Sequence, residues 1–198
     1  MIAVVKYNAG NVHSVVNAIN RIGYECVVTD DKDLISRADH VIFPGVGEAS
    51  SAMRCLKESG LDKTILSLKQ PFLGICLGMQ LMTKHSEEGN VDLLSIYPDD
   101  EVLRFPSGRG YKIPHVGWNS IKVIDDRLFH NIPSDSYFYF VHSYYVPESK
   151  YSAALCSYDD ISFSSSLSKD NFFGLQFHPE KSGSLGEQVL RNFLEVIK

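Results

Sequence analysis

The segment Gly74-Ile75-Cys76-Leu77-Gly78 places a cysteine between two glycines, where an apolar run gives way to a helical pattern. This is the context of a nucleophile elbow, a tight strand-to-helix turn that exposes one reactive side chain at the edge of a sheet. The glycines permit unusual backbone angles, and a helix N-terminus favours the thiolate. The alternative is a buried cysteine in a packed unit, because free cysteine is commonly buried. The context favours a nucleophile at Cys76, and Cys26, Cys55 and Cys156 lack it.

A base and a carboxylate that suit such a thiol stand together in the segment His178-Pro179-Glu180, after the apolar run FFGLQF. Pro179 favours an extended backbone at His178, and side chains two residues apart on an extended segment point to the same side. Glu180 is then expected to hold one imidazole nitrogen while the other faces the thiol. A histidine beside a surface glutamate is also a common arrangement. Together with the upstream elbow, however, the segment predicts a Cys76–His178–Glu180 triad.

Acyl transfer also requires backbone N–H groups that point at the developing oxyanion. One donor is expected to be the amide of Leu77, directly after the nucleophile. Another is expected in the loop Pro44-Gly45-Val46-Gly47, which follows a neighbouring strand. The same glycines begin like a dinucleotide-binding loop, but the third glycine is missing and the loop follows the third strand rather than the first. An ordinary turn between a strand and a helix is the remaining alternative.

The elements that must position these residues alternate between strand and helix in the first part of the chain. Apolar runs predict strands at 2–7, 24–29, 40–43 and 71–75. Helices are predicted from a cap at Asn11 to Gly23, in segments that reach Lys69, and from Leu77 to His85. Such alternation is typical of a parallel sheet with helices on both faces.

The second part of the chain is richer in aromatic residues and in strand-like segments, at 101–105, 120–124, 137–146, 151–156 and 161–177. The last of these predicts a hairpin with its turn near Lys169-Asp170-Asn171. An amphipathic helix is predicted at about 184–197. The whole pattern predicts an α/β fold with a central, mostly parallel sheet flanked by helices, additional antiparallel strands in the second half, and a single domain over 1–198.

Composition excludes several other classes of protein. The net charge is −5, so the basic stripe of a nucleic-acid-binding protein is not expected. The four cysteines form no C-x-x-C pair, and the histidines show no metal-ligand spacing, so neither a metal nor a cofactor is expected. The opening MIAVVKYNAG lacks the features of a signal peptide, and no apolar run is long enough to span a bilayer. We expect a cytoplasmic protein with free thiols.

The segments PGVG, GICLGMQ and FHPEKSG together resemble those of the class I (triad) glutamine amidotransferases. The opening YNAGNVHSV and the segments IPHVGWNS at 113–120 and YFVHSYYV at 139–146 narrow the resemblance to the glutaminase subunits of imidazole glycerol phosphate synthase. The similarity runs from the first strand to the last helix. It implies hydrolysis of L-glutamine to glutamate and ammonia, which supports formation of imidazole glycerol phosphate and AICAR in histidine biosynthesis.

The resemblance also implies residue roles. Cys76 would attack the glutamine carboxamide, His178 would protonate the departing ammonia and activate water, and Glu180 would orient His178. The glutamine pocket would be lined by Gly47, Gln80, His142, Ser143 and Tyr144. The partner, a (βα)8-barrel cyclase subunit that forms a heterodimer, would lie against Gly10, Asn11, Trp118, Tyr139 and Lys181. In this family the glutaminase is weak until the partner and its ligand bind, and Gly45-Val46 would then turn an amide toward the oxyanion.

Several of these roles have simpler alternatives, and other functions remain open. Trp118 suits a core position as well as an interface, whereas Gln80 lies four residues after Cys76 and shares its helix face. The chain has Tyr97-Pro98-Asp99-Asp100 where the family usually has a glycine-containing turn. A paralogue that supplies ammonia for surface-sugar amidination is therefore an alternative. A stand-alone thiol hydrolase of γ-glutamyl compounds and a binding module with an inert triad are two others.

Overall fold

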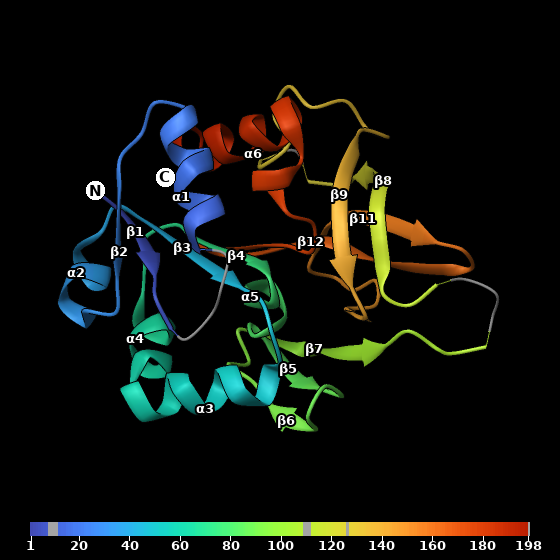
Figure 1. Cartoon of the computed structure of the whole chain (residues 1–198), viewed down its shortest axis with the longest axis horizontal. Helices are drawn as coiled ribbons and strands as arrows, with labels where there is room; N and C mark the ends of the chain where they lie inside the picture. Colours follow the sequence, from blue (N-terminus) through green and yellow to red (C-terminus); the bar gives the residue numbers. More distant parts are fainter. Residues whose placement is uncertain (8–11, 109–111, 126, 198) are drawn as a thin grey trace.

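The structure, a computed structural model, describes residues 1–7, 12–108, 112–125 and 127–197, and its strands form two sheets (Figure 1). The larger sheet has nine strands in the order β2 (Cys26–Thr29), β1 (Ile2–Val5), β3 (His40–Gly45), β4 (Phe72–Cys76), β13 (Phe172–Leu175), β12 (Ile161–Lys169), β11 (Ser152–Tyr158), β8 (His115–Val123) and β9 (Tyr137–His142). The smaller sheet has four strands in the order β10 (Tyr144–Tyr145), β7 (Tyr97–Arg104), β5 (Thr83–Ser86) and β6 (Val91–Asp92).

The first five strands of the larger sheet are parallel, and the inner four, β1, β3, β4 and β13, are covered on both faces. Alternate residues of β1 belong to different core clusters: Ile2 and Val4 pack with one, Ala3 and Val5 with the other. The first cluster includes side chains from α1 (Val12–Arg21) and α6 (Gly183–Glu195), which lie together above the sheet in Figure 1. The second includes side chains from α2 (Lys32–Arg37), α3 (Ala49–Ser59) and α4 (Leu61–Ser67). These layers confirm the predicted α/β fold.

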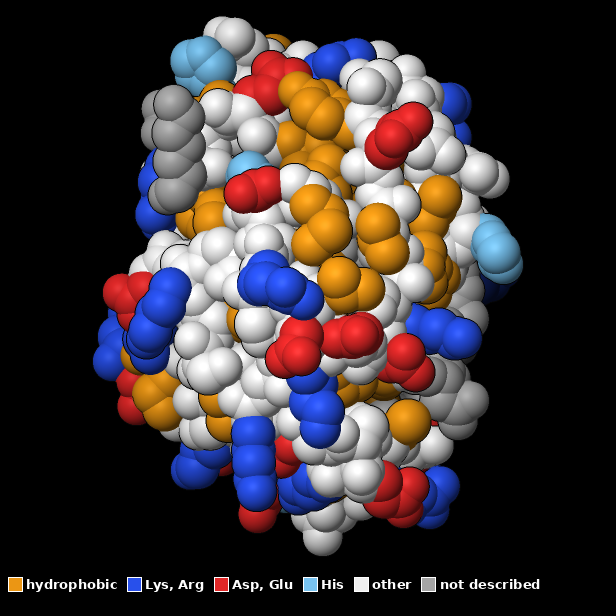
Figure 2. Space-filling view, turned by 90° about the vertical axis from the view of Figure 1, so that its left-hand side faces the viewer, with side chains coloured by type: hydrophobic (Ala, Val, Ile, Leu, Met, Phe, Trp, Pro, Cys, Tyr) orange, Lys and Arg blue, Asp and Glu red, His pale blue; other side chains and the backbone are white. Residues whose placement is uncertain are grey.

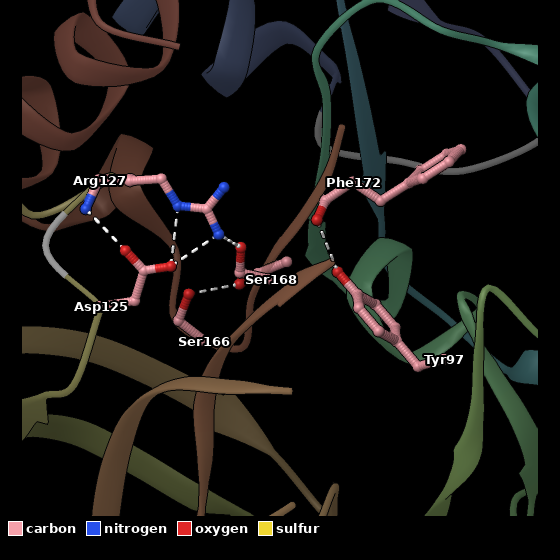
Figure 3. Close-up of polar contacts among 7 residues, drawn as sticks. Tyr97, Asp125, Arg127, Ser166, Ser168 and Phe172 are labelled. Carbon is pink, nitrogen blue, oxygen red and sulfur yellow. Dashed lines mark hydrogen bonds and ion pairs between the residues drawn. The ribbon is translucent and has the colours of Figure 1, made fainter. Parts of the chain in front are cut away.

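The antiparallel strands of the second half extend the same sheet beyond β13. The predicted hairpin is present: β12 pairs with β13, and Asp170 adopts a positive φ of 54° in its turn. Neighbouring residues hold this hairpin in place (Figure 3). The Tyr97 hydroxyl donates to the Phe172 carbonyl at 3.0 Å, and the guanidinium of Arg127 bonds both Asp125 and Ser168. The hairpin therefore places the residues after β13 next to the end of β4.

Two helices differ from the sequence-based expectation. The helix predicted from Leu77 to His85 is wrong beyond its first turn, because α5 spans only Leu77–Gln80 and the chain continues as β5. The Thr83 hydroxyl donates to the Gln80 carbonyl at 2.9 Å, and β5 pairs with both β6 and β7. This pairing outweighs local helix preference. The short helix α2 was not predicted, although its cap, Asp31, accepts from the backbone amides of Asp33 and Leu34. The predicted cap at Asn11 lies outside the described residues.

Strand β2 forms one edge of the larger sheet, where β1 is its only partner among the described strands. Val27 and Val28 on this strand are 42% and 41% exposed. The space-filling view of this side shows apolar side chains interspersed with acidic and basic ones (Figure 2). Exposed charges beside an edge strand oppose its pairing with another chain. The edge lies at the opposite end of the sheet order from β8 and β9.

Candidate active site

Cys76 ends β4 and begins the turn into α5, with φ of 54° and ψ of −111°. A non-glycine residue in this region of backbone space is strained, and such strain is concentrated at functional sites. The flanking glycines are required by close packing. A Cβ on Gly78 would lie 1.9 Å from the Phe43 carbonyl oxygen, and a Cβ on Gly74 would lie 2.6 Å from the Gly78 oxygen. The turn therefore has the geometry that a nucleophile elbow needs.

Replacement of Gly78 by alanine is expected to lower the free energy of unfolding by roughly 3 kcal/mol, because the added methyl group would overlap the backbone of β3. Urea denaturation monitored by circular dichroism measures this loss. Gly183→Ala is the matched control, since Gly183 has a φ of 61° but open space around the position of a Cβ. Equal midpoints for the two variants would show that the Gly78 contact does not limit the fold.

The imidazole of His178 is bonded to Glu180, with 2.8 Å between Nδ1 and Oε1, and both side chains are buried. The His178 backbone amide donates to the Tyr139 carbonyl at 2.9 Å, which anchors this segment to β9. The expected contact is present, but its predicted geometric reason is wrong. Only His178 is extended, whereas Pro179–Lys181 forms a 3₁₀ turn that carries Glu180 back to the ring. Proline is favourable at the first position of such a turn because it needs no N–H partner there.

The charge state of His178 follows from two opposing effects. Burial lowers the pKa of His178, but its interactions with Cys76 and Glu180 outweigh burial and raise this pKa to about 10. The second ring nitrogen, Nε2, is buried and makes no well-aligned hydrogen bond among the described residues. Catalytic hydrogen bonds are often loose before substrate binds. The structure therefore places a protonated imidazole near the Cys76 sulfur.

The predicted oxyanion residues lie around the cysteine. Gly45 is the residue of β3 that pairs with Cys76 of β4, and a Cβ on Gly45 would lie 2.7 Å from the Gly78 amide nitrogen. Val46 and Gly47, the latter with a φ of 109°, line a cavity of about 470 Å³ with Cys76 and Leu77. The first amides of a helix lack partners within the helix, so the amide of Leu77 suits a donor role. The loop follows β3 and borders the nucleophile, which disfavours the dinucleotide-loop alternative.

The same cavity brings together the residues that the resemblance assigned to glutamine: Gly47, Gln80, His142, Ser143 and Tyr144. His178 and Lys181 also line it, as do three residues that sequence reasoning missed, Glu88, Pro114 and Val141. Glu88 is the informative addition, because its carboxylate accepts from the Ala49 amide at 3.0 Å and burial raises its pKa. No sequence signal identified it, since the segment that contains it lacks a motif.

A chain of hydrogen bonds with fixed direction supports one wall of the cavity. The Nδ1 of His142 donates to the Tyr144 carbonyl at 2.7 Å, so its Nε2 must accept from Nδ1 of His115, 3.0 Å away. The amide of Asn119 approaches Nε2 of His115 at 3.3 Å. Burial lowers the pKa of His115 to about 4 and that of His142 to about 3. Both imidazoles are therefore neutral at physiological pH.

These lowered pKa values predict acid sensitivity of the fold. Below pH 6.5 the imidazoles of His115 and His142 bind protons in the unfolded chain but stay neutral when buried in the folded chain. The folded state is therefore destabilised as the pH falls from 6.5 toward 4. His115→Gln is expected to remove about 2 kcal/mol of that loss. Denaturation at several pH values measures it, with His130→Gln, at an exposed position, as the control. An unchanged pH dependence in His115→Gln would contradict the neutral state of this ring.

The predicted partner residues that the structure describes also lie together. Trp118 on β8 is directly opposite Tyr139 on β9, with ring centroids 6.2 Å apart, and the Lys181 ammonium lies 5.8 Å from the centre of the Tyr139 ring. Trp118 is 55% exposed, so it is not a core residue. Val116 and Tyr137 are exposed on the same face of these strands. Gly10 and Asn11 lie outside the described residues.

Two further observations bear on other classes of site. Within the described ranges, no group of three or more histidine, cysteine, aspartate or glutamate side chains is arranged to hold a metal ion. The helices of the described part of the chain are too short or too polar to cross a membrane.

The chain was compared with known proteins. The family pattern described as "Glutamine amidotransferase class-I" matches residues 3–197. A protein of Bacteroides fragilis named "Imidazole glycerol phosphate synthase subunit HisH" is 55% identical over 98% of this chain and 99% of its own length. A protein of the same name from Pasteurella multocida is 46% identical over 100% of this chain and 98% of its own length. A protein of Methanococcus maripaludis named "Imidazole glycerol phosphate synthase subunit HisH 2" is 44% identical over 98% of this chain and 99% of its own length.

Solved structures support the fold. One titled "Crystal structure of glutamine amidotransferase" superposes with a TM-score of 0.74 at 17% identity and covers 98% of this chain and 97% of that one. Another, titled "Structure of PurLQS from Thermotoga maritima", superposes with a TM-score of 0.70 at 19% identity, over 98% and 96%. The full-length relatives confirm the predicted resemblance and the assignment as an amidotransferase enzyme. The chain belongs to the class I glutamine amidotransferase family, in the group that its HisH-named relatives represent.

Proposed function

We propose that the protein is the glutaminase subunit of an imidazole glycerol phosphate synthase, acting in histidine biosynthesis. It hydrolyses L-glutamine to glutamate and ammonia and passes the ammonia to a synthase subunit, which forms imidazole glycerol phosphate and AICAR. The observation that carries this proposal is that Cys76 and His178 line one cavity and Glu180 holds His178 from behind, in a chain of this family. The match with HisH-named relatives over nearly their whole length supports the pathway over surface-sugar amidination.

The proposed reaction has two steps. The Cys76 thiolate attacks the carboxamide carbon of glutamine, and the amide of Leu77 with a turned amide of the Gly45-Val46 segment stabilises the oxyanion. His178 gives a proton to the departing ammonia, which leaves a glutamyl thioester on the sulfur. His178 then takes a proton from water, and the resulting hydroxide attacks the thioester and releases glutamate. Glu180 holds Nδ1 of His178 throughout, so that Nε2 handles the protons.

The remaining cavity residues suit the ends of a glutamine molecule. The Glu88 carboxylate is proposed to accept from the α-ammonium group of the substrate, since a half-buried carboxylate favours a cationic partner. Gln80, His142, Ser143, Tyr144 and Gly47 are proposed to surround the rest of the molecule. Residues Gln80 and His142 are themselves held by hydrogen bonds to the Tyr144 carbonyl, which keeps this wall rigid.

The partner is proposed to be a (βα)8-barrel cyclase that forms a heterodimer through the exposed face of β8 and β9. This face carries Val116, Trp118 and Tyr137, and exposed apolar patches are typical of binding surfaces. Tyr139 and Lys181 lie at its border with the cavity, because Lys181 lines the cavity and covers the Tyr139 ring. Ammonia released at Cys76 would therefore leave toward the partner. We also propose that residues 1–198 form one domain that acts in the cytoplasm.

Glutamate release by the purified chain tests the proposal, first alone and then with candidate cyclase subunits and their nucleotide ligand. Weak hydrolysis that rises strongly with one cyclase supports the proposed function and identifies the pathway. Full activity without any partner would instead indicate a stand-alone hydrolase. An exchange of the partner for a cyclase-like subunit of sugar amidination serves as the specificity control.

A further inference from the structure

The side chain of Gln176 approaches the nucleophile from inside the protein. Gln176 directly follows β13 and is fully buried, and its Nε2 lies 3.7 Å from the Cys76 sulfur, within hydrogen-bond range for sulfur. It does not line the substrate cavity. The contact therefore reaches the sulfur on the side away from glutamine, where no substrate competes for it.

The direction of this hydrogen bond is fixed by its neighbours. A backbone carbonyl can only accept, so the atom of Gln80 that lies 3.0 Å from the Tyr144 oxygen must be its Nε2. The same nitrogen lies 2.9 Å from the Gln176 side chain, which must therefore present Oε1 toward Gln80. Because Oε1 of Gln176 faces Gln80, its Nε2–H group must face the Cys76 sulfur. This removes the ambiguity that usually attends a glutamine amide.

The backbone holds Gln176 as firmly as the side chain does. Its amide nitrogen donates to the Ser165 carbonyl on β12 at 2.9 Å, which continues the hairpin pairing beyond β13. Gln176 and His178 are two residues apart, and both side chains interact with the cysteine, while Phe177 between them packs into the core. One short segment thus supplies both the base and an amide donor to the sulfur.

We propose that Gln176 is a positioning residue for the nucleophile: its side-chain amide donates to the Cys76 thiolate and fixes the direction from which the sulfur attacks, while Gln80 and the Tyr144 carbonyl keep the amide in that orientation. The inference rests on the proposed function, because it assumes that Cys76 is the nucleophile. It gives Gln80 a second role, in which its nitrogen orders Gln176 from the wall of the cavity. An amide donor is suited to a thiolate because a hydrogen bond to a charged acceptor is stronger than one to a neutral group.

The test measures how fast iodoacetamide alkylates Cys76 in the intact chain at a series of pH values, with the adduct quantified on the Cys76 peptide by mass spectrometry. Gln176→Met keeps the size of the side chain and removes the donor. We expect the midpoint of its pH profile to rise by about one unit and its alkylation rate at neutral pH to fall about tenfold. Gln80→Leu keeps the Gln176 amide but removes the hydrogen bond that orients it. We therefore expect a smaller upward shift of the midpoint of the pH profile.

The control separates this effect from general loosening of the hairpin. Ser166→Ala removes a buried hydrogen bond of 2.8 Å to the Gly174 carbonyl on β13 without contact to the sulfur, so its profile should match the wild type. The other titratable groups that face the sulfur are His178, with Glu180 behind it, and the phenol of Tyr7, and none of them is replaced.

Each outcome has one meaning. An upward shift in Gln176→Met that Ser166→Ala does not share supports the proposal, and the smaller upward shift in Gln80→Leu supports it even if the methionine variant fails to fold. A profile of Gln176→Met that superimposes on the wild type would overturn the positioning role alone. A wild-type Cys76 that resists alkylation at every pH would overturn the proposed function as well.

Discussion

Replacement of Cys76 by alanine is expected to lower the kcat for glutamine hydrolysis by at least ~10⁴-fold while the fold and partner binding persist. No other described thiol can substitute. Cys156 is buried, and burial raises its pKa to about 12, while Cys26 and Cys55 do not line the cavity. Glutamate release by the complete complex measures the loss, and gel filtration with the partner confirms assembly. Cys156→Ala should retain full activity and serves as the control for loss of a buried thiol.

A second substitution at the same position tests whether the strained backbone belongs to the nucleophile. The φ of 54° is costly for alanine and for cysteine, whereas glycine adopts such angles freely. Cys76→Gly should therefore be as inactive as Cys76→Ala but more stable to heat or urea, by about 1 kcal/mol. Hydrolysis that survives in Cys76→Ala would exclude the proposed mechanism. Equal stability of the two variants would show that the elbow is not strained.

The parts of the fold that the sequence predicts well are those governed by local pattern. The strands of the parallel half are apolar runs bounded by turn residues, and β4 with its following glycines could be placed because both features occur within a few residues. The hairpin of β12 and β13 is predictable for the same reason. Cys76 and His178 could be assigned because each follows an apolar strand, and Glu180 because it lies two residues after His178.

What the sequence could not predict depends on contacts between distant segments. The stretch that becomes β5 directly follows α5, and pairing with β6 and β7 makes it a strand. Glu88 reaches the cavity because β5 and β6 turn the chain back toward α3, where Glu88 binds the Ala49 amide. Gln176 lacks any signal, since its side-chain partners are Gln80 in α5 and Cys76 at the end of β4. Three-dimensional pairing alone identifies residues of this kind.

One backbone carbonyl connects these residues. The Tyr144 carbonyl oxygen accepts hydrogen bonds from Gln80 and His142. The His142 ring is hydrogen-bonded to His115, which is hydrogen-bonded in turn to Asn119 on β8. In the other direction Gln80 donates a hydrogen bond to Gln176, and Gln176 donates one to the Cys76 sulfur. Every bond in this path has a fixed donor. The wall of the cavity, the nucleophile and the strand that carries Trp118 are therefore ordered by one network of buried polar groups, in which a single loss leaves a partner unsatisfied.

Glu180→Gln is expected to lower the kcat for glutamine hydrolysis by about 10²- to 10⁴-fold with little change in KM. The carboxylate accepts from Nδ1 of His178 at 2.8 Å and helps to raise the pKa of that imidazole. A glutamine amide is able to donate at this position, which would move the ring proton to Nε2, and a protonated Nε2 on a neutral ring cannot accept a proton. Glu180 does not line the cavity, so substrate binding should persist.

The signature of this variant is a change at His178 rather than a loss of structure. Loss of the carboxylate should lower the pKa of His178 from its value of about 10, which titration of the imidazole proton signals by NMR detects. Glu187→Gln provides the matched control, because Glu187 pairs with Arg21 on the surface at 2.9 Å and lies outside the cavity. Its activity and its histidine titration should equal those of the wild type. A Glu180→Gln variant with normal turnover and an unchanged His178 titration would show that the base orients itself without the carboxylate, and the site would then act as a Cys76–His178 pair.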